Sequence, residues 1–417
     1  MTASASYASR SLFFAPALPA VGRSVLALLV SGYIVLLPYQ FKIGSSVNFA
    51  PSDCFLILAL LFGAGQLKYC TPAWSPFHLG VALVFVLGAL ICALRYGHVA
   101  PYELLNKGAG LLLLVLSYLA CTSVVSEWED VRRILRLFIV SVFLENLLAV
   151  SAFFAGYFFG ASTSFVRYDG LRLSGMLLDP NAYGGLLAVA LVSAEAASTG
   201  HSPLFRRRAL MAIRASLALG LLFTFSRSAW LGLVLALLFL IMLKPSIFVR
   251  VAASVLIGIP LTLVFMGSRF VPIVEEMARR PEQVQERFDL IQQAVEVFRR
   301  HPFFGGGLGS FRLTAGEIAH NSAMWFLADF GILGLGVLIG FLAWFFRKGW
   351  LAYRTAPESE RPLVLALLLA HIAMTGLAMG IEAFYQRHWW VILALIASSY
   401  GLTQRRRISP ESQGAVQ

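Results

Sequence analysis

Hydrophobic positions run along most of the chain in long stretches, and short polar segments separate them. A transmembrane α-helix needs roughly 17–25 mainly apolar residues to cross a hydrocarbon core about 30 Å thick. By this measure the pattern predicts an all-α polytopic membrane protein with about twelve transmembrane helices. The predicted spans are approximately 23–41, 49–66, 77–94, 103–122, 134–159, 181–198, 209–226, 228–243, 247–266, 322–346, 362–381 and 388–403.

The longest polar interruption runs from Gly267 to His320. Some of its apolar residues recur at spacings of three and four, which predicts one apolar stripe on an extramembrane helix. These residues are Val284, Phe288, Ile291, Val295 and Phe298. The chain therefore divides into four parts: spans one to nine in 1–266, a helical loop in 267–320, spans ten to twelve in 321–403, and a polar tail in 404–417.

The composition agrees with this division. Hydrophobic residues make up 59% of the 417 residues and charged residues only 13%. The mean hydropathy is +0.77. Such a composition excludes a soluble globular protein, because too few polar side chains are present to cover its surface.

The basic residues predict the orientation of the spans, since cytoplasmic loops carry an excess of Lys and Arg. With the N-terminus in the cytoplasm, 19 of the 33 basic residues fall on the cytoplasmic side and 7 in the shorter outer segments. The other 7 lie in the 267–320 loop, where the rule has little force. Both termini are therefore predicted to be cytoplasmic and the long loop extracytoplasmic. The net charge of +12 is explained by the basic residues that set this orientation, and we do not interpret it as a sign of nucleic-acid binding.

The cysteines give no indication of a metal centre or a disulfide framework. Cys54, Cys70, Cys92 and Cys121 lie in or beside the predicted spans, without metal-ligand spacing. The first hydrophobic helix is predicted to be retained instead of cleaved as a signal peptide.

Arginines occur in three separate outer segments. Arg167 and Arg172 follow the fifth span, Arg227 lies between the seventh and eighth, and Arg287 lies in the long loop. A guanidinium offers planar, bidentate donors to phosphate oxygens, so these arginines would suit a diphosphate without a metal ion.

Each of these residues also has a structural interpretation. Arg227 suits an interfacial turn between two helices, and Arg287 suits a solvated or lipid-anchoring side chain. Asp179 before Pro180 indicates first a helix N-cap with Pro at the first helical position.

His320 is the candidate general base, because it is titratable near neutral pH and lies where the long loop meets the tenth span. Its structural alternative is a loop histidine beside a helix start that Asn321 or Ser322 caps. Among the other histidines, His301 is expected to mark a helix end, His371 to contact another helix, and His388 to anchor at the interface beside Trp389 and Trp390.

Gly305-Gly306-Gly307-Leu308-Gly309 resembles a phosphate-binding loop only superficially. It lacks the following Lys-Ser/Thr and a preceding strand, which makes ATP binding improbable. Turn geometry with positive φ is the better explanation.

The order of these features resembles the O-antigen ligase and Wzy-type O-antigen polymerase superfamily. The features that carry the resemblance are the Ser226-Arg227-Ser228 turn, the helix with Arg287, the turn from Pro302 to Phe311, and His320-Asn321-Ser322 before a glycine-bearing span. The resemblance implies a metal-independent glycosyltransferase without a cofactor, in the bacterial inner membrane. Its donor would be a glycan linked to undecaprenyl diphosphate, used at the periplasmic face.

By the same resemblance, Arg227 and Arg287 match the paired diphosphate-binding arginines of the family, and His320 matches its essential loop histidine. Arg279 and Arg269 are alternatives to Arg287. His320 would then position or deprotonate an acceptor hydroxyl.

Three further residues, Arg172, Arg167 and Asn321, are candidates for substrate contacts. The acceptor would be a second lipid-linked glycan in a polymerase or lipid A-core in a ligase, and membrane lipids would surround the spans. The alternative class is a transporter, such as a flippase of lipid-linked sugars, although the predicted spans carry few polar residues at midplane depth.

Overall fold

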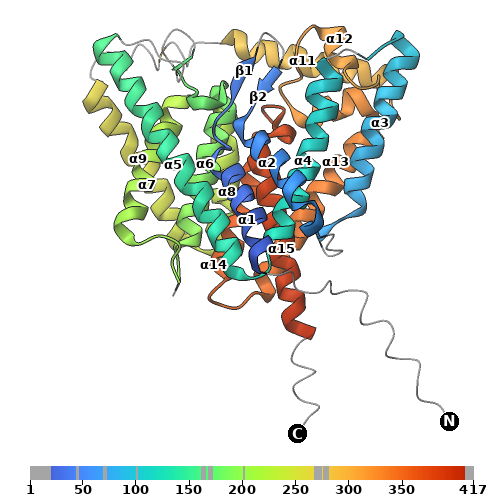
Figure 1. The fold of residues 1–417 in the computed structure, drawn as a ribbon. Helices are drawn as coiled ribbons and strands as arrows, with labels where there is room; N and C mark the ends of the chain where they lie inside the picture. The colour runs from blue at the N-terminus through green and yellow to red at the C-terminus, as the bar shows by residue number, and fades with distance from the viewer. Residues whose placement is uncertain are drawn as a thin grey trace, which may run out of the picture.

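The computed structural model of the protein describes residues 20–43, 47–68, 73–99, 102–160, 166–167, 172–200, 202–266, 275 and 281–408. Helices make up most of this part of the chain, in agreement with the predicted all-α class (Figure 1). Its strands form two short antiparallel hairpins. These are β1 (Phe41–Ile43) with β2 (Val47–Phe49), and β3 (Val166–Arg167) with β4 (Arg172–Leu173).

A helix occupies each of the twelve apolar runs. These helices are α1 (Ala20–Val35), α2 (Pro51–Gly63), α3 (Pro76–Tyr96), α4 (Gly110–Val124), α5 (Trp128–Phe159), α6 (Pro180–Ala197), α7 (Arg207–Thr224), α8 (Arg227–Leu243), α9 (Pro245–Met266), α13 (Ser322–Thr355), α14 (Arg361–Leu377) and α15 (Arg387–Ile408). In the described chain, four helical segments are long and apolar enough to cross a membrane: Pro76–Tyr96, Glu103–Val124, Trp128–Gly156 and Ser322–Thr355. The number of twelve spans stays a prediction.

Shorter elements gather at one end of the helices, which we call the loop end. There lie α11 (Pro281–Arg300), α12 (Ser310–Ala315) and the β1–β2 hairpin, whereas α15 ends on the opposite side (Figure 1). A π-helical segment, η4 (Glu103–Ala109), precedes α4. Short 3₁₀ turns form η2 (Ala64–Gln66), η5 (Gly175–Leu177) and η7 (Ala383–Tyr385).

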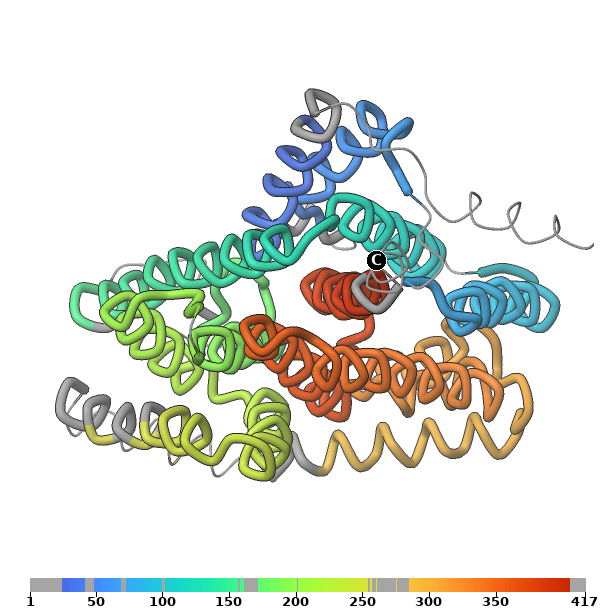
Figure 2. The backbone as a smooth tube through the Cα atoms, turned by 90° about the horizontal axis from the view of Figure 1, so that it is seen from below, coloured from blue at the N-terminus to red at the C-terminus, as the bar shows by residue number. Residues whose placement is uncertain are grey.

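The packed centre of the bundle contains α6 and α14 (Figure 2). Every residue of α6 except Asn181 is buried. Glycine lets α8 approach α14 closely, because a Cβ added at Gly232 would lie 2.3 Å from the carbonyl oxygen of Ala373. Small residues at such contacts are typical of helix packing in membranes. This contact holds α8 and α14 side by side.

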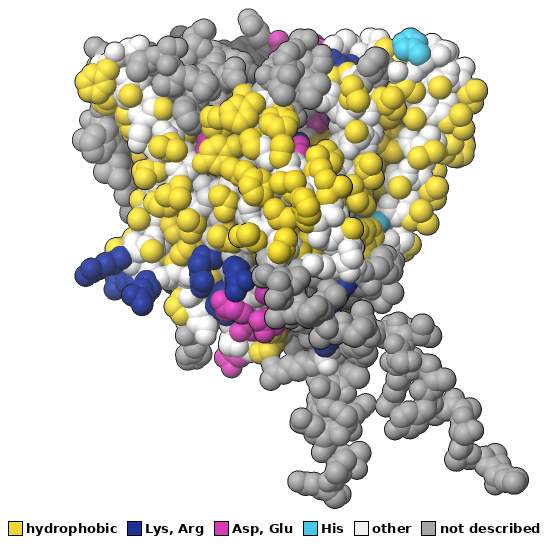
Figure 3. Space-filling view, in the orientation of Figure 1, with side chains coloured by type: hydrophobic (Ala, Val, Ile, Leu, Met, Phe, Trp, Pro, Cys, Tyr) yellow, Lys and Arg dark blue, Asp and Glu magenta, His cyan; other side chains and the backbone are white. Residues whose placement is uncertain are grey.

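Apolar side chains cover the middle of the molecular surface seen in Figure 3, with charged side chains below them. On α3, Val86 is 68% exposed and Leu94 is 77% exposed. Contiguous exposed hydrophobic surface of this kind marks an interaction with lipid or another apolar partner. The surface therefore supports the membrane character of the fold.

The packed face of α11 differs from the predicted apolar stripe. Ala294 is fully buried and Val297 is 7% exposed, whereas Phe288, a member of the stripe, is 58% exposed. The packed residues are offset by one position because α11 rests on α13 through its 290–294–297 face. Arg287 precedes Leu290 by three positions, so it lies on the packed side of the helix.

Candidate functional site

A tight turn between α7 and α8 presents Arg227 at the loop end. Phe225 closes α7 in the left-handed conformation, with a φ of 47°. Ser226 then begins α8, because its hydroxyl accepts a hydrogen bond from the amide of Ala229 at 3.2 Å. Ser226 and Ser228 are buried, and Arg227 between them is exposed. The guanidinium is thus attached to the first residue of a helix, where the helix dipole adds positive potential.

Arg287 of α11 lies within electrostatic reach of Arg227. Burial lowers the pKa of this half-buried arginine, and the positive charge of Arg227 lowers it further, while Asp179 acts in the opposite direction. Two cations therefore lie close enough to repel each other, and Asp179 offsets part of this repulsion at Arg287. An anion that contacts both arginines would relieve their mutual repulsion. Arg279 and Arg269, the alternatives to Arg287, lie outside the described residues.

Asp179 and Arg172 support this region from beside the α7–α8 turn. Asp179 accepts hydrogen bonds from the amides of Asn181 at 3.0 Å and Ala182 at 3.4 Å, so the predicted helix cap is confirmed. Arg172 is 7% exposed, and its Nε donates to the carbonyl oxygen of Thr224 at 2.9 Å. Its Nη2 donates to Oδ1 of Asn181 at 3.0 Å. Arg172 thereby ties β4 and the start of α6 to the turn that carries the exposed arginine.

Arg167 lies on β3, opposite Arg172 in the hairpin register. Its side chain is outside the described set, so its predicted substrate contact stays a prediction.

His320 occupies an uncommon backbone position just before α13. Its φ is 46°, in the left-handed region, which costs a non-glycine residue about 1–3 kcal/mol. The neighbouring residues hold it there: the amide of Ala319 donates to Oε1 of Glu382 at 3.2 Å, and Oδ1 of Asn321 accepts from the amide of Ala323 at 2.9 Å. The imidazole itself has no polar partner among the residues that the structure describes. It is therefore available to a ligand.

The segment after α14 connects this loop to the α7–α8 turn. Nδ2 of Asn321 donates to the carbonyl oxygen of Met379 at 2.9 Å. The next residue, Gly380, is so close to the turn that an added Cβ would lie 2.4 Å from the Cβ of Ser228. Met379 and Gly380 therefore contact both loops, which brings the predicted catalytic histidine and arginine into one neighbourhood. Asn321 is used in capping and in this link.

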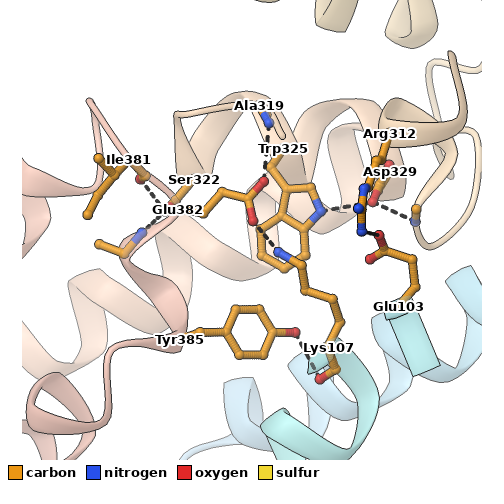
Figure 4. Close-up of polar contacts among 12 residues, drawn as sticks. Glu103, Lys107, Arg312, Ala319, Ser322, Trp325, Asp329, Ile381, Glu382 and Tyr385 are labelled. Carbon is orange, nitrogen blue, oxygen red and sulfur yellow. Dashed lines mark hydrogen bonds and ion pairs between the residues drawn. The ribbon is translucent and has the colours of Figure 1, made fainter. Parts of the chain in front are cut away.

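A buried ion pair supports the histidine loop from the side of η4 (Figure 4). Lys107 pairs with Glu382, which also accepts from the amide of Ala319. The Lys107 ammonium lies 4.2 Å from the ring centre of Trp325 and 4.9 Å from that of Tyr385. Sequence reasoning missed Lys107, although a lysine within an apolar run is a recognised sign of a functional or paired charge.

Asp329, in α13, organises the glycine-rich turn before α12 (Figure 4). Its carboxylate accepts hydrogen bonds from the amides of Gly309 at 2.8 Å and Phe311 at 2.9 Å. The Ser310 hydroxyl and the Trp325 indole also donate to it, at 3.0 and 2.8 Å. An acid inside an apolar helix thus serves as the acceptor for a loop that precedes that helix.

The glycine-rich turn has no amide left for a phosphate. All amides from Gly305 to Phe311 donate to protein acceptors, including the carbonyl oxygens of Ala328, Asp329 and Gly88. Gly305, Gly307 and Gly309 have φ values of 70°, 105° and 84°. The expected positive-φ turn is confirmed.

The surroundings of His371 and His388 are well defined. His371 accepts from the Trp389 indole at 3.0 Å and contacts the carbonyl oxygen of Leu342 at 3.0 Å, so the expected contact between helices is confirmed. His388 is 3% exposed and Trp390 is 1% exposed. The expected interfacial anchor at His388 is therefore wrong, because this end of α15 packs inside the bundle.

In the described parts of the chain, no three His, Cys, Asp or Glu side chains are grouped so that they would hold a metal ion. The cysteines described, Cys54, Cys92 and Cys121, are free thiols. Cys70 lies outside the described residues.

Comparison with known proteins adds one match. The family model described as O-antigen ligase matches residues 212–339, from α7 into α13. This segment includes Arg227, Arg287, His320 and the glycine-rich turn. No curated protein matches the chain. The family match covers the segment that holds these residues and supports membership of the O-antigen ligase and polymerase superfamily.

Proposed function

We propose that the protein is a membrane-embedded glycosyltransferase that takes its glycan from undecaprenyl diphosphate. The observation that carries the proposal is the electrostatic coupling of Arg287 to Arg227, beside the loop that presents His320. The match to O-antigen ligases supports a lipid-linked glycan as the class of donor. Arginine chemistry supports the diphosphate as the group that is bound.

The two arginines would bind the diphosphate and stabilise it as it leaves. A pair of unit charges about 4 Å apart near a protein surface interacts by roughly 4 kcal/mol before desolvation is subtracted. A guanidinium can also donate two parallel hydrogen bonds to phosphate oxygens. Arg227 and Arg287 together would therefore neutralise the developing charge without a metal ion.

The proposed reaction is a direct displacement at the anomeric carbon. His320 accepts the proton of an acceptor hydroxyl, and the hydroxyl oxygen forms a new bond to the anomeric carbon. The bond between that carbon and the diphosphate oxygen breaks, and its electron pair leaves with undecaprenyl diphosphate. Stabilisation of charge on a leaving group is often the largest catalytic term. Direct displacement inverts the configuration at the anomeric carbon.

The roles of the neighbouring residues follow from their contacts. Arg172 donates to Thr224 and Asn181, so we propose that it positions the α7–α8 turn in addition to any contact with sugar or phosphate. Asn321 caps α13 and binds Met379, which suits a residue that orients the preceding histidine.

We place the reaction on the periplasmic face of the bacterial inner membrane. The distribution of Lys and Arg predicts that the 267–320 loop is outside and that both termini are cytoplasmic. In that orientation the loop end, with Arg287 and His320, faces the periplasm.

The test is transfer by the purified protein with lipid-linked repeat units. Elongation of the lipid-linked glycan would identify a polymerase, and transfer only to lipid A-core would identify a ligase. The same assay in excess chelator should retain activity, because the arginines neutralise the diphosphate. Movement of the lipid-linked glycan across a bilayer without bond formation would instead establish the flippase and contradict the proposal.

A further inference from the structure

A second basic site lies at the other end of the helices. A cavity of about 780 Å³ is bordered there by residues at the ends of α6, α7, α8, α9 and α14. Its described lining contains five basic side chains and one acidic side chain: Arg207, Arg214, Lys244, Arg250, Arg361 and Glu358. The 18 residues of α7 separate Arg207 from the turn at Arg227, which corresponds to about 27 Å. This cavity is thus distinct from the candidate transferase site.

Three helices begin at the cavity. Arg207 is the first residue of α7, Ser246 is the second residue of α9, and Arg361 is the first residue of α14, and all three line the cavity. A helix N-terminus carries partial positive charge through the helix dipole. Converging N-termini and basic side chains therefore act in the same direction, and both favour an anion.

The arginines at the back of the cavity are held in place. Glu195, which is fully buried, pairs with Arg214 and lies 3.5 Å from Nε of Arg250. Nε of Arg361 donates to the carbonyl oxygen of Ala356 at 3.3 Å. Glu195 thus holds two guanidinium groups at the back of the cavity.

The basic side chains at the entrance of the cavity differ from those at the back in their exposure and their partners. Arg207 and Lys244 are exposed and have no ionic partner within the described chain. The need for cytoplasmic positive charge alone does not explain their position. Arg206 and Arg208 supply such charge from the same segment without lining the cavity.

The cavity also has an apolar wall. Ile247 is 2% exposed and Leu365 is 1% exposed, whereas Met211, which also lines the cavity, is 48% exposed. The wall therefore continues toward the outside of the bundle, where Val249 is 59% exposed. A ligand with a phosphate and an attached apolar part would match both the charge and the wall.

We propose that this cavity binds a phosphate-bearing anion, supplied either by the headgroup of an anionic lipid or by a soluble phosphate compound. The phosphate would lie among Arg207, Lys244 and the start of α14. Bidentate donors from arginine fit its oxygens.

The test measures binding of a fluorescent phosphatidylglycerol to the purified full-length protein in neutral detergent. Two double variants that each remove two positive charges are compared: Arg207→Gln with Lys244→Gln, and Arg206→Gln with Arg208→Gln. The cavity variant should weaken binding about tenfold or more, because it loses two charge-assisted contacts. The matched variant should bind as the natural protein does. All these side chains are exposed, so folding is preserved, and a thermal unfolding measurement checks this.

Competition then identifies the source of the phosphate. Displacement of the lipid by inorganic pyrophosphate would indicate a soluble phosphate compound, and lack of displacement would indicate a lipid headgroup. Either result supports the cavity as a phosphate site. Equal weakening in both double variants, unchanged binding in the cavity variant, or no binding by the natural protein would overturn the proposal.

Discussion

His320 combines a left-handed backbone with an imidazole that no described residue binds. Glycine adopts this backbone conformation at little cost, whereas histidine is strained there. The hydrogen bonds of Ala319 and Asn321 keep the strained residue in place. A strained side chain that no described residue binds supports the proposed contact with a substrate.

This explanation predicts that His320→Gly separates stability from activity. The glycine relieves strain, so the free energy of unfolding should stay the same or rise, while glycan transfer should fall about 10²-fold or more through loss of the general base. Thermal unfolding and transfer by the purified variant give the two quantities. His301→Ala, which removes another loop-end histidine, should keep its activity. Near-normal transfer by His320→Gly would rule out the base.

A second prediction concerns the arginine pair. Arg227→Lys and Arg287→Lys keep the charge but lose the planar pair of donors, so transfer should fall strongly in each at normal protein abundance. Arg299→Lys, an exposed change on the same helix as Arg287, is the matched control and should be neutral. Full activity in both test variants would remove the diphosphate clamp from the mechanism, because lipid-anchoring arginines tolerate lysine.

The sequence predicted some of these residues and missed others for a physical reason. Arg227 and His320 were singled out because polar residues between apolar runs mark loops, and their roles stay predictions. Lys107 and Asp329 lie inside apolar runs. The partner of Lys107, Glu382, is 275 positions away, and Asp329 accepts from amides 18 and 20 positions before it. Only the folded chain brings such partners together.

Among the secondary-structure elements, α13 is the least regular of the long helices. Gly331 breaks its helical geometry with a φ of 66°. The turn before α12 fills the break: the amide of Ile332 donates to the carbonyl oxygen of Pro302 at 2.9 Å, and the amide of Gly306 donates to that of Ala328 at 2.9 Å. The loop thus replaces hydrogen bonds that the helix loses.

This arrangement predicts opposite effects for two glycine substitutions. A Cβ at Gly305 would lie 2.3 Å from the carbonyl carbon of Asp329 at positive φ, so Gly305→Ala should destabilise the protein by about 2–4 kcal/mol. A Cβ at Gly336, also in α13, meets nothing within 4 Å. Gly336→Ala should therefore be neutral or stabilise by up to about 1 kcal/mol. Thermal unfolding in detergent measures both, and equal stabilities would contradict a close contact between the turn before α12 and α13.

The helices themselves were largely predictable, because each apolar run is long enough to indicate one helix. The details were not. The break at Gly331 depends on hydrogen bonds with the turn before α12, which a periodic pattern does not contain, and the β1–β2 hairpin and η4 are too short to give a periodic signal. The packed face of α11 was misjudged because its partner, α13, determines which side is buried.

The arrangement of the bundle also makes its orientation testable. Glu317 is exposed at the loop end, and Arg208 is exposed near the start of α7 at the other end. In a variant whose four native cysteines are replaced by Ser, Glu317→Cys should react with a membrane-impermeant thiol reagent added outside the inner membrane. Arg208→Cys should react only after the membrane is permeabilised. The reverse labelling would place the candidate transferase site in the cytoplasm.

The hydrogen bonds between the glycine-rich turn and α13 predict that the turn and this part of the helix open as one cooperative unit. The amides of Gly306 and Gly307 donate to carbonyl oxygens within the helix, so they can exchange with solvent only when that part of α13 also opens. In native-state hydrogen exchange, these two amides should be protected to the same extent as those of Ile332 and Leu333. Much faster exchange at the glycines would show that the turn opens independently. The glycine-rich turn is therefore expected to be as rigid as the part of α13 beneath it.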